Sequence, residues 1–473
     1  MSTPTRRAFV RHTALLAAGV ALAGAARAGA APALPVVRPA PGQRRFRSAA
    51  VEAAIAEFGA RVKEDPELAW LFGNCLADTL DNHVRYAEPE GQPDTFVSAG
   101  GADADVMSLR GSTVQVWPYL ALAPREAALR QLLAGVIRRQ ARCVLLDPYA
   151  STFYLDPTRV GAAETGQPAP RPGVHGRQWA LDALCYPLRL AYHYWKTTGD
   201  TQPFDADWRR ALGLAVSTMR EQQLKTGPGP YHYQHASADA LATRPQGGYG
   251  YPARPCGLVA SAFGPGGEAT RLPFLVPSNF LAVVSLRQAA LMLSDVYHEP
   301  AGYTELMQLA DEVAVALRQH ALVPHPALGH VYAYEVDGYG GYSLQDKAPA
   351  PSLLALPYLD ALPLNDPTYQ QTRRLSLSSA NPFFYQGPAA AGLGSPRTGP
   401  GAVWPLGIAL RGLTSPNAAE VRACVLALQA AQAGTGYLPE TVSVAASGPA
   451  NQPRCAWASA LGAEFLWQAL GSG

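Results

Sequence analysis

Residues 178–200 read QWALDALCYPLRLAYHYWKTTGD, and the spacing of their apolar side chains decides the fold class. Apolar residues recur there at intervals of three and four: Leu181, Leu184, Cys185, Leu188, Ala191 and Trp195. This spacing places one broad apolar stripe along a helix. It predicts a helix of about five turns from Gln178 to Lys196.

The same period recurs on both sides of this stretch. It predicts further helices over residues 124–143, 208–224, 278–296, 303–320 and 455–470. Near the C-terminus, Ser415 and Pro416 predict the N-cap and first turn of another helix. With shorter helices between them, we expect about a dozen in all.

Strand patterns are few, and VYAYEVDG at residues 331–338 is the best candidate, for a short hairpin. The sequence therefore predicts an all-α protein with long loops and at most short β-hairpins. No heptad repeat is sustained, which favours a toroid of paired helices over a coiled coil. Helical period and helix number alone do not separate such a toroid from another large helical fold.

Length and composition allow one large domain or two ordinary ones after an export signal, and no second domain is needed. The chain has 473 residues, of which 48% are apolar and 16% charged, enough to bury a large core. Residues 1–30 contain a twin arginine, Arg6 and Arg7, followed by an apolar run too short to remain as a membrane span. We expect export through the twin-arginine pathway to the periplasm or the extracellular medium. A Pro-rich linker at residues 31–47 then leads to a single domain at 48–473.

Charge, cysteine and histidine patterns exclude several classes of function. Without residues 1–30 the basic and acidic residues nearly balance, so no nucleic-acid or acidic-lipid partner is expected. The six cysteines form no CxxC pair, and we expect most of them to act as small apolar residues. There is no HExxH or GxSxG motif, and His232 and His235 have no carboxylate at ligand spacing. No metal and no cofactor is expected.

Blocks spread over most of the chain share the pattern of a known enzyme family. They include LRGSTVQVWPYL (109–120), VYAYEVDGYG (331–340), NDPTYQQTRRLSLSSANPFFYQG (365–387) and AGLGSPRTG (391–399). These blocks resemble glycoside hydrolase family 125, the exo-α-1,6-mannosidases that work without a metal. The resemblance implies an (α/α)6 barrel, an inverting mechanism and a carbohydrate ligand, an α-mannoside or a related glycan.

The stretch SAFGPGGEATRLPFLVPSN at residues 261–279 carries the candidate general acid. The family pattern there reads roughly SGFRPSDDAC, then FLIPSNMFA, so RPSDDA has become GPGGEA. One member of that acidic pair is the family's general acid. If it is the first, Gly267 stands in its place and the chemistry is lost. If it is the second, Glu268 replaces it with a side chain longer by one carbon–carbon bond. The competing interpretation of Glu268 is an exposed loop residue.

The candidate general base is Glu440, in TGYLPETV at residues 435–442. The family pattern there resembles TGFMHESF, so Pro439 stands in place of a histidine. A glycosidase needs one carboxyl group that donates a proton and another that activates water or attacks carbon. A capping carboxylate at the start of a helix is the competing interpretation of Glu440.

The resemblance adds candidate substrate contacts: Arg110, Gln115, Trp117, Asp182, Arg397 and Trp404. Buried ion pairs are the competing account of both arginines. Several neighbouring polar positions depart from the family pattern. Gly111 stands where the family has Asp, Lys347 where it has an acid, and Arg397 where it has His.

Three functions are compatible with these residues. The leading one is inverting hydrolysis of terminal α-mannosides, with Glu440 as base and Glu268 as a substitute acid, at altered or weak activity. The second is binding of a glycan or a partner protein by a family member that no longer catalyses hydrolysis but keeps the substrate pocket. The third is an active enzyme of changed specificity, because subsite polarity can change without the fold.

Overall fold

A computed structural model describes residues 34–100, 104–161, 166–167, 169–235, 241–445 and 453–471. The export signal expected at residues 1–30 lies outside the described residues. The chain divides into two compact units, Met1–Val36 and Val37–Gly473, and every helix and strand among the described residues lies in the second. Residues 37–47, expected as part of a linker, belong to this second unit and include a short 3-10 helix at Pro41–Gln43.

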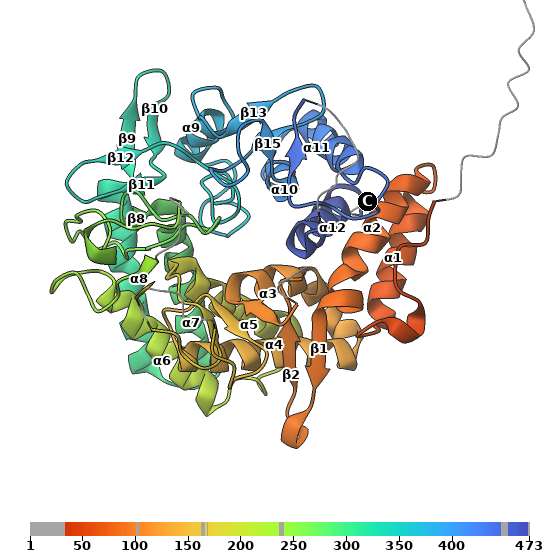
Figure 1. Cartoon of the computed structure of the whole chain (residues 1–473), viewed down its shortest axis with the longest axis horizontal. Coiled ribbons are helices and arrows are strands. Elements are labelled where there is room, and N and C mark those ends of the chain that lie inside the picture. The colour runs from red at the N-terminus through yellow and green to blue at the C-terminus, as the bar shows by residue number, and fades with distance from the viewer. Residues whose placement is uncertain are drawn as a thin grey trace, which may run out of the picture. The chain divides into compact units, whose positions relative to one another are not determined.

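The described residues form twelve α-helices, arranged as a ring in the second unit (Figure 1). Their bounds are α1 Ala49–Arg61, α2 Pro66–Asp78, α3 Leu109–Val116, α4 Ala127–Leu146, α5 Leu181–Thr198, α6 Ala206–Glu221, α7 Val276–Asp295, α8 Pro300–His320, α9 Pro367–Ser376, α10 Pro405–Leu413, α11 Ala418–Ala431 and α12 Ala456–Leu470. This ring is the toroid of paired helices that the sequence predicts.

Burial separates inner from outer helices. In α7, fifteen of twenty residues are buried, whereas its partner α8 has six of twenty-one. A helix buried all round lies inside a fold, and one with a single apolar stripe lies on its surface. By burial, α2 (nine of thirteen residues), α3 (six of eight), α5 (twelve of eighteen), α10 (seven of nine) and α12 (nine of fifteen) resemble α7 and form the inner wall with it. Among them, α3, α5 and α12 have their first turns close together, because Arg110 of α3 contacts Asp182 of α5 and Trp457 of α12.

Helix α5 confirms the prediction made from residues 178–196. It begins at Leu181 and ends at Thr198, where Gly199 takes a left-handed φ of 70° that closes the helix. The predicted apolar stripe is buried except for Trp195, which is partly exposed. The other five predicted helices correspond to α4, α6, α7, α8 and α12, with ends shifted by a few residues.

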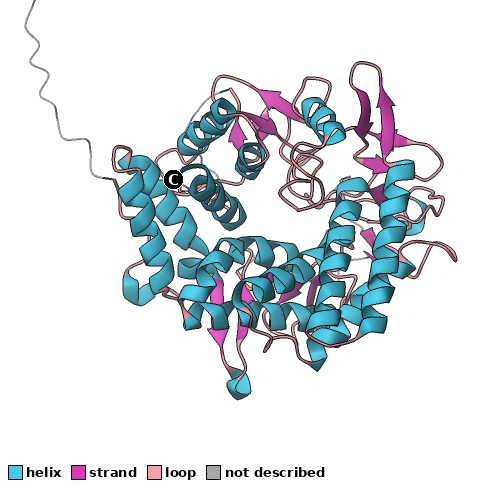
Figure 2. Cartoon of the chain, turned by 180° about the vertical axis from the view of Figure 1, so that it is seen from behind, coloured by secondary structure: helices cyan, strands magenta, loops and turns pink. Residues whose placement is uncertain are grey.

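Strands are short and lie in loops between helices (Figure 2). Their bounds are β1 Val84–Ala87, β2 Asp94–Val97, β3 Val106–Ser108, β4 Thr152–Tyr154, β5 Gly166–Gln167, β6 Val174–Gly176, β7 Gln234–His235, β8 Phe274–Leu275, β9 Leu322–His325, β10 Gly329–Tyr332, β11 Glu335–Val336, β12 Tyr342–Ser343, β13 Phe384–Gln386, β14 Ala391–Leu393, β15 Ala402–Val403 and β16 Val442–Ser443. They form two- and three-stranded sheets. The predicted strand 331–338 falls on β10 and β11, which pair with β9 and with β8 and β12 respectively, all antiparallel.

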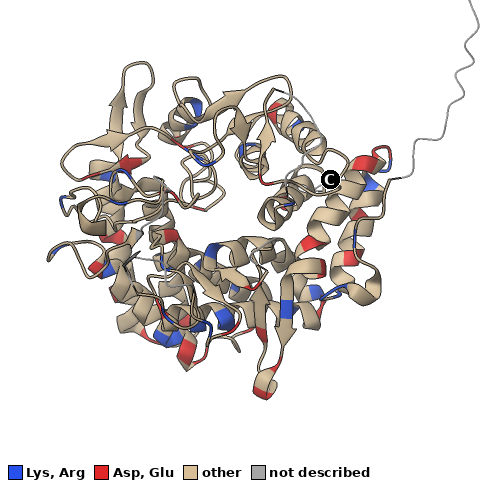
Figure 3. Cartoon of the chain, viewed as in Figure 1, with Lys and Arg blue, Asp and Glu red and all other residues tan. Residues whose placement is uncertain are grey.

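Helix α7 is long and apolar enough to cross a membrane by length and composition alone. In the protein, however, 78% of the apolar window is buried against other elements, as in the core helix of a soluble domain. Acidic and basic residues are interspersed around the ring in the view of Figure 3. All six cysteines lie in the described ranges and are free thiols.

Candidate active site

Three inner helices meet through their first turns. Arg110, Asp182 and Trp457 are each the second residue of their helix, α3, α5 and α12. The Arg110 guanidinium donates to the fully buried Asp182 carboxylate and lies over the Trp457 ring, 5.4 Å from its centre. One arginine therefore joins three helix N-termini at one end of the barrel, and a carboxylate there is favoured by the α5 dipole.

The candidate acid is carried by a tight turn over these helix ends. The Gly267 amide donates to the Gly264 carbonyl at 3.0 Å, and the Gly264 amide donates to the Glu268 carbonyl at 2.8 Å. Gly267 has a φ of 78°, which few other residues adopt without strain. Arg110 donates to the Pro265 carbonyl at 2.6 Å. Arg397 donates to the Gly267 carbonyl at 2.7 Å, so two arginines hold the turn from both sides.

Glu268 is buried, with 3% of its surface exposed, so the interpretation of an exposed loop glutamate is wrong. The glycines around it make this burial possible. A Cβ at Gly266 would lie 2.5 Å from Oε2 of Glu268, and one at Gly264 would lie 3.1 Å from Oε1. The change from RPSDDA to GPGGEA thus provides the space in which the longer glutamate folds back over its own turn.

Lys347 is the charged partner of Glu268. Its Nζ lies 3.3 Å from Oε1, and only 7% of the lysine is exposed. The same ammonium lies 5.0 Å from the ring centre of Tyr334 and 5.8 Å from that of Phe383. By contrast, Oε2 of Glu268 is buried and has no hydrogen-bond partner among the described residues. One oxygen of the carboxyl group is thus used in a buried ion pair, and the other has no hydrogen-bond partner in the described residues.

Two further buried carboxyl groups lie beside this pair. Burial raises the pKa of Asp346 to about 6, although its oxygens accept from the amides of Leu353 at 2.8 Å and Leu354 at 3.0 Å. Burial also raises the pKa of Glu335, against the opposing effect of Lys347, and the charge of Glu268 adds to the rise. The site therefore combines several acidic groups with one buried ammonium.

Glu440, the candidate base, is exposed and lies beside the start of α12. Just before it, Pro439 pairs with Arg454 in an isolated β-bridge, and the Cys455 amide donates to the Leu438 carbonyl at 2.8 Å. Burial and then the charge of Glu440 raise the pKa of Cys455, the N-cap of α12, to about 11. Glu440 and Arg110 thus both approach the first turn of the same inner helix.

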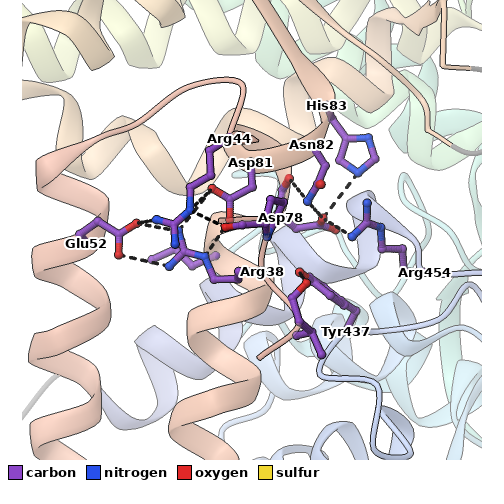
Figure 4. A network of polar contacts seen from close by, with 12 residues as sticks. Arg38, Arg44, Glu52, Asp78, Asp81, Asn82, His83, Tyr437 and Arg454 are labelled. Atoms are coloured by element: carbon purple, nitrogen blue, oxygen red, sulfur yellow. Dashed lines mark hydrogen bonds and ion pairs between the residues drawn. The ribbon is translucent and has the colours of Figure 1, made fainter. Parts of the chain in front are cut away.

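A polar network fixes the segment that carries Glu440 (Figure 4). Arg454 lies over the Tyr437 ring at 5.0 Å, and its Nη1 is 3.5 Å from Oδ1 of Asp78. Asp78 is fully buried, and its Oδ1 also accepts from the Asn82 amide at 2.9 Å. His83 Nε2 is 3.6 Å from the same oxygen. The π-helical turn Thr79–His83 places Asn82 and His83 beside this carboxylate.

The remaining predicted contacts lie in different places. Trp404, the N-cap of α10, donates to Ser395 Oγ at 3.3 Å, and the same hydroxyl accepts from the Arg397 amide at 3.3 Å. Trp404 therefore supports the loop that holds the Glu268 turn. Gln115 is buried and donates to the Ser98 carbonyl at 3.1 Å. Trp117 lies beyond the end of α3 and lines a cavity away from Glu268.

The sequence interpretation does not include the partner of Glu268. Lys347 stands where the family has an acid, but the sequence does not pair it with Glu268. A charge argument indicates the pair, because one block loses an acid while another gains a base, which balances charge when the two lie together. Within the described ranges no three His, Cys, Asp or Glu side chains gather in a way that could hold a metal ion.

Comparison with known proteins identifies the family. The metal-independent alpha-mannosidase (GH125) family model matches residues 65–467. The chain belongs to this family. As a GH125 member it is a glycoside hydrolase-like protein with the (α/α)6 barrel.

Two relatives of the GH125 chain match over nearly their whole lengths. A Streptococcus pneumoniae metal-independent α-mannosidase, solved in a non-productive substrate complex with α-1,6-mannobiose, is 34% identical with a TM-score of 0.86. That match covers 91% of this chain and 100% of the other. The meiotically up-regulated gene 157 protein of Schizosaccharomyces pombe is 34% identical over 455 residues, which cover 92% of this chain and 89% of that protein.

More distant structures share the fold alone. A bacterial glucoamylase complexed with acarbose is 14% identical with a TM-score of 0.54, and the match covers 85% of this chain and 55% of the other. The barrel is therefore shared beyond the mannosidases.

Proposed function

We propose that the protein hydrolyses terminal α-mannosides with inversion, at an activity lowered by the departures from the family pattern. The observation that carries the proposal is the placement of Glu268. A glycine turn, held by Arg110 through the Pro265 carbonyl, buries this carboxyl group, and one of its oxygens has no protein partner in the described structure. A carboxyl group in such a place can hold a proton towards a leaving oxygen.

In the reaction, Glu440 would remove a proton from water as the water oxygen bonds to the anomeric carbon. The bond from that carbon to the glycosidic oxygen breaks, and Oε2 of Glu268 gives its proton to the leaving oxygen. Exchange with solvent then returns the proton from Glu440 to Glu268. Arg110 holds the turn through the Pro265 carbonyl, and Asp182 keeps the guanidinium in place.

The test is hydrolysis of α-1,6-linked mannobiose by the mature protein, with the product anomer followed by proton NMR. Glu440→Gln and Glu268→Gln should each lower kcat by about 10²–10⁴. Glu305→Gln, an exposed carboxyl group on α8, is the matched control and should leave kcat unchanged. The first product should be the β-anomer. Activity that survives Glu268→Gln would contradict the assignment of the acid.

A second candidate function, glycan binding without turnover, is favoured by one specific observation. Lys347 holds Glu268 in a buried ion pair, which is a structural use of the carboxylate that competes with proton donation. This function predicts no hydrolysis by the wild-type protein, with mannoside binding still measurable by calorimetry.

Export through the twin-arginine pathway, to the periplasm or the extracellular medium, is also part of the proposal. It rests on residues 1–30 of the sequence, and fractionation of expressing cells tests it.

A further inference from the structure

The opposite end of the barrel contains a second group of polar and aromatic residues. Trp117, Arg189 and Glu464 lie eight positions after Leu109, Leu181 and Ala456, the first residues of α3, α5 and α12. Eight residues correspond to about 12 Å along a helix. These three side chains therefore meet at a level of the barrel well away from the first turns that hold Arg110, Asp182 and Trp457.

Two adjoining cavities open at this level. One has a volume of about 410 Å³ and the other about 680 Å³, and both are lined by Trp117, His193, Glu464 and Gln468. Their remaining walls differ in polarity. The smaller cavity is lined by apolar residues: Ala54, Phe72, Leu76, Leu120, Leu122 and Trp467. The larger one is lined by Arg189, Tyr358 and Asp360 among others. Cavities of this size hold small ligands in other proteins.

The charges of the larger cavity are already matched within the protein. Arg189 donates to the Tyr358 carbonyl at 2.9 Å and to Asp360 at 3.3 Å, and its guanidinium stacks on the Trp117 ring at 3.7 Å. His193 Nε2 lies 3.6 Å from the same Asp360 carboxylate. A charged ligand would therefore leave a charge without a partner in a partly buried place.

Glu464, which lines both cavities, also has hydrogen-bond partners within the protein. It accepts from the Tyr358 hydroxyl at 2.8 Å and from the Gln468 amide at 3.2 Å, and burial raises its pKa to about 7. Arg189, which is 3% exposed, keeps one polar atom unused. Its Nε has no hydrogen-bond partner in the described part of the chain. An uncharged group would leave this balanced set of charges undisturbed, whereas a charged group would not.

We propose that the two cavities form a second binding site, for an uncharged amphiphile with a hydroxylated head and a hydrocarbon tail. Hydroxyl groups can accept from Arg189 and His193 and donate to Asp360, so the head lies in the larger cavity. The tail lies in the smaller one, where the apolar wall favours hydrocarbon over water. An alkyl glycoside is the simplest molecule of this class. The site is separate from the Glu268 turn and does not depend on hydrolysis.

The test is calorimetric titration of the mature protein with n-octyl β-D-glucoside below its micelle concentration. A second titration uses the Glu440→Gln variant, in which saturating α-1,6-mannobiose occupies the other end of the barrel without turnover. We expect saturable binding of one molecule. Methyl β-D-glucoside should bind at least about tenfold more weakly, because burial of only a few methylene groups accounts for that factor. Octyl sulfate, which has the same tail and a charged head, should also bind more weakly.

Two tryptophan variants locate the site. Thr197 lines the smaller cavity from the exposed side of α5, so Thr197→Trp should fill the cavity and weaken octyl glucoside binding at least about tenfold. Ser217→Trp, at an exposed position on α6, is the matched control and should bind as the wild type does. Binding unaffected by Thr197→Trp, or absent from the wild type, would overturn the proposal. If octyl sulfate binds as tightly as octyl glucoside, the site does not require an uncharged head. If methyl glucoside binds as tightly, the hydrocarbon tail does not bind in the smaller cavity.

Discussion

At the scale of single residues, the ion pair of Glu268 and Lys347 is the main difference between this chain and the GH125 family pattern. Both side chains are buried, and their charged atoms lie 3.3 Å apart. Removal of one member of such a pair leaves a buried charge without compensation, which costs about 3–5 kcal/mol. Removal of both charges leaves no such penalty. The free energy of unfolding should therefore depend strongly on whether the pair is intact, independently of any catalytic role of Glu268.

We predict that Lys347→Met lowers the free energy of unfolding by about 3–5 kcal/mol at neutral pH, because methionine fills the space without the charge. Urea unfolding followed by tryptophan fluorescence measures the change. The double variant Lys347→Met with Glu268→Gln should recover most of the loss. If Lys347→Met unfolds at the same urea concentration as the wild type, the pair does not contribute to stability as its burial indicates.

The sequence predicts part of this site and not the rest, for a physical reason. Arg110 and Asp182 fall in helix starts with clear apolar periods, so their helices and their family positions are both recognisable. Lys347 and Glu268 are 79 residues apart, and each lies in a loop without periodicity. Which loops meet depends on the packing of the whole barrel. The burial of Glu268 depends in addition on the absence of side chains at Gly264 and Gly266, which spacing alone does not reveal.

At the scale of elements, the spacing of apolar residues predicts where helices lie, but it predicts the residues at which they begin and end less accurately. The sequence predicts Ser415 as N-cap and Pro416 in the first turn, but α11 begins at Ala418 with Asn417 as its N-cap. The Asn417 side chain accepts from the amides of Ala419 at 2.8 Å and Glu420 at 3.4 Å. Ser415 Oγ instead donates to the Glu420 carboxylate at 2.5 Å. Serine and asparagine cap equally well, so the sequence does not decide between neighbours.

This arrangement predicts unequal effects of two substitutions. Asn417→Ala should lower the free energy of unfolding by about 1 kcal/mol, whereas Asn417→Gly should lower it by only a few tenths. Ser415→Ala, the matched control, should cost less than Asn417→Ala because it leaves both capped amides with their acceptor. Thermal unfolding of the three variants gives the ranking. A larger loss for Ser415→Ala would mean that the helix begins where the sequence predicts.

At the scale of the whole molecule, a ring is stable only when its two ends are joined. Here α11 lies against α2, since Gln429 donates to Asp65 at 3.0 Å and Gln432 donates to Glu67 at 2.6 Å. The Tyr437 hydroxyl donates to the Val37 carbonyl at 3.4 Å. These partners are more than 360 residues apart. The family resemblance predicts that the barrel closes, but only the structure identifies which residues close it.

Residues 37–47 take part in this closure through Asp81. Arg38 Nε donates to the Asp81 carboxylate at 2.7 Å, and Arg44 Nε lies 3.6 Å from its other oxygen (Figure 4). Asp81 is buried, with 3% exposed, and belongs to the π-helical turn beside Asp78 and Arg454. Both arginines also pair with Glu52 on α1. The segment therefore neutralises a buried carboxylate close to Asp78 and Arg454, which hold the loop that carries Glu440.

We predict that a chain starting at residue 48 is less stable than one starting at residue 37 by about 1–3 kcal/mol, because Asp81 loses its ion pairs with both arginines. Urea unfolding of the two chains measures the difference. Asp81→Asn in the shorter chain removes the unpaired charge and should restore part of the loss. Equal midpoints for the chains starting at 37 and 48 would show that residues 37–47 are a linker in function as well as in composition.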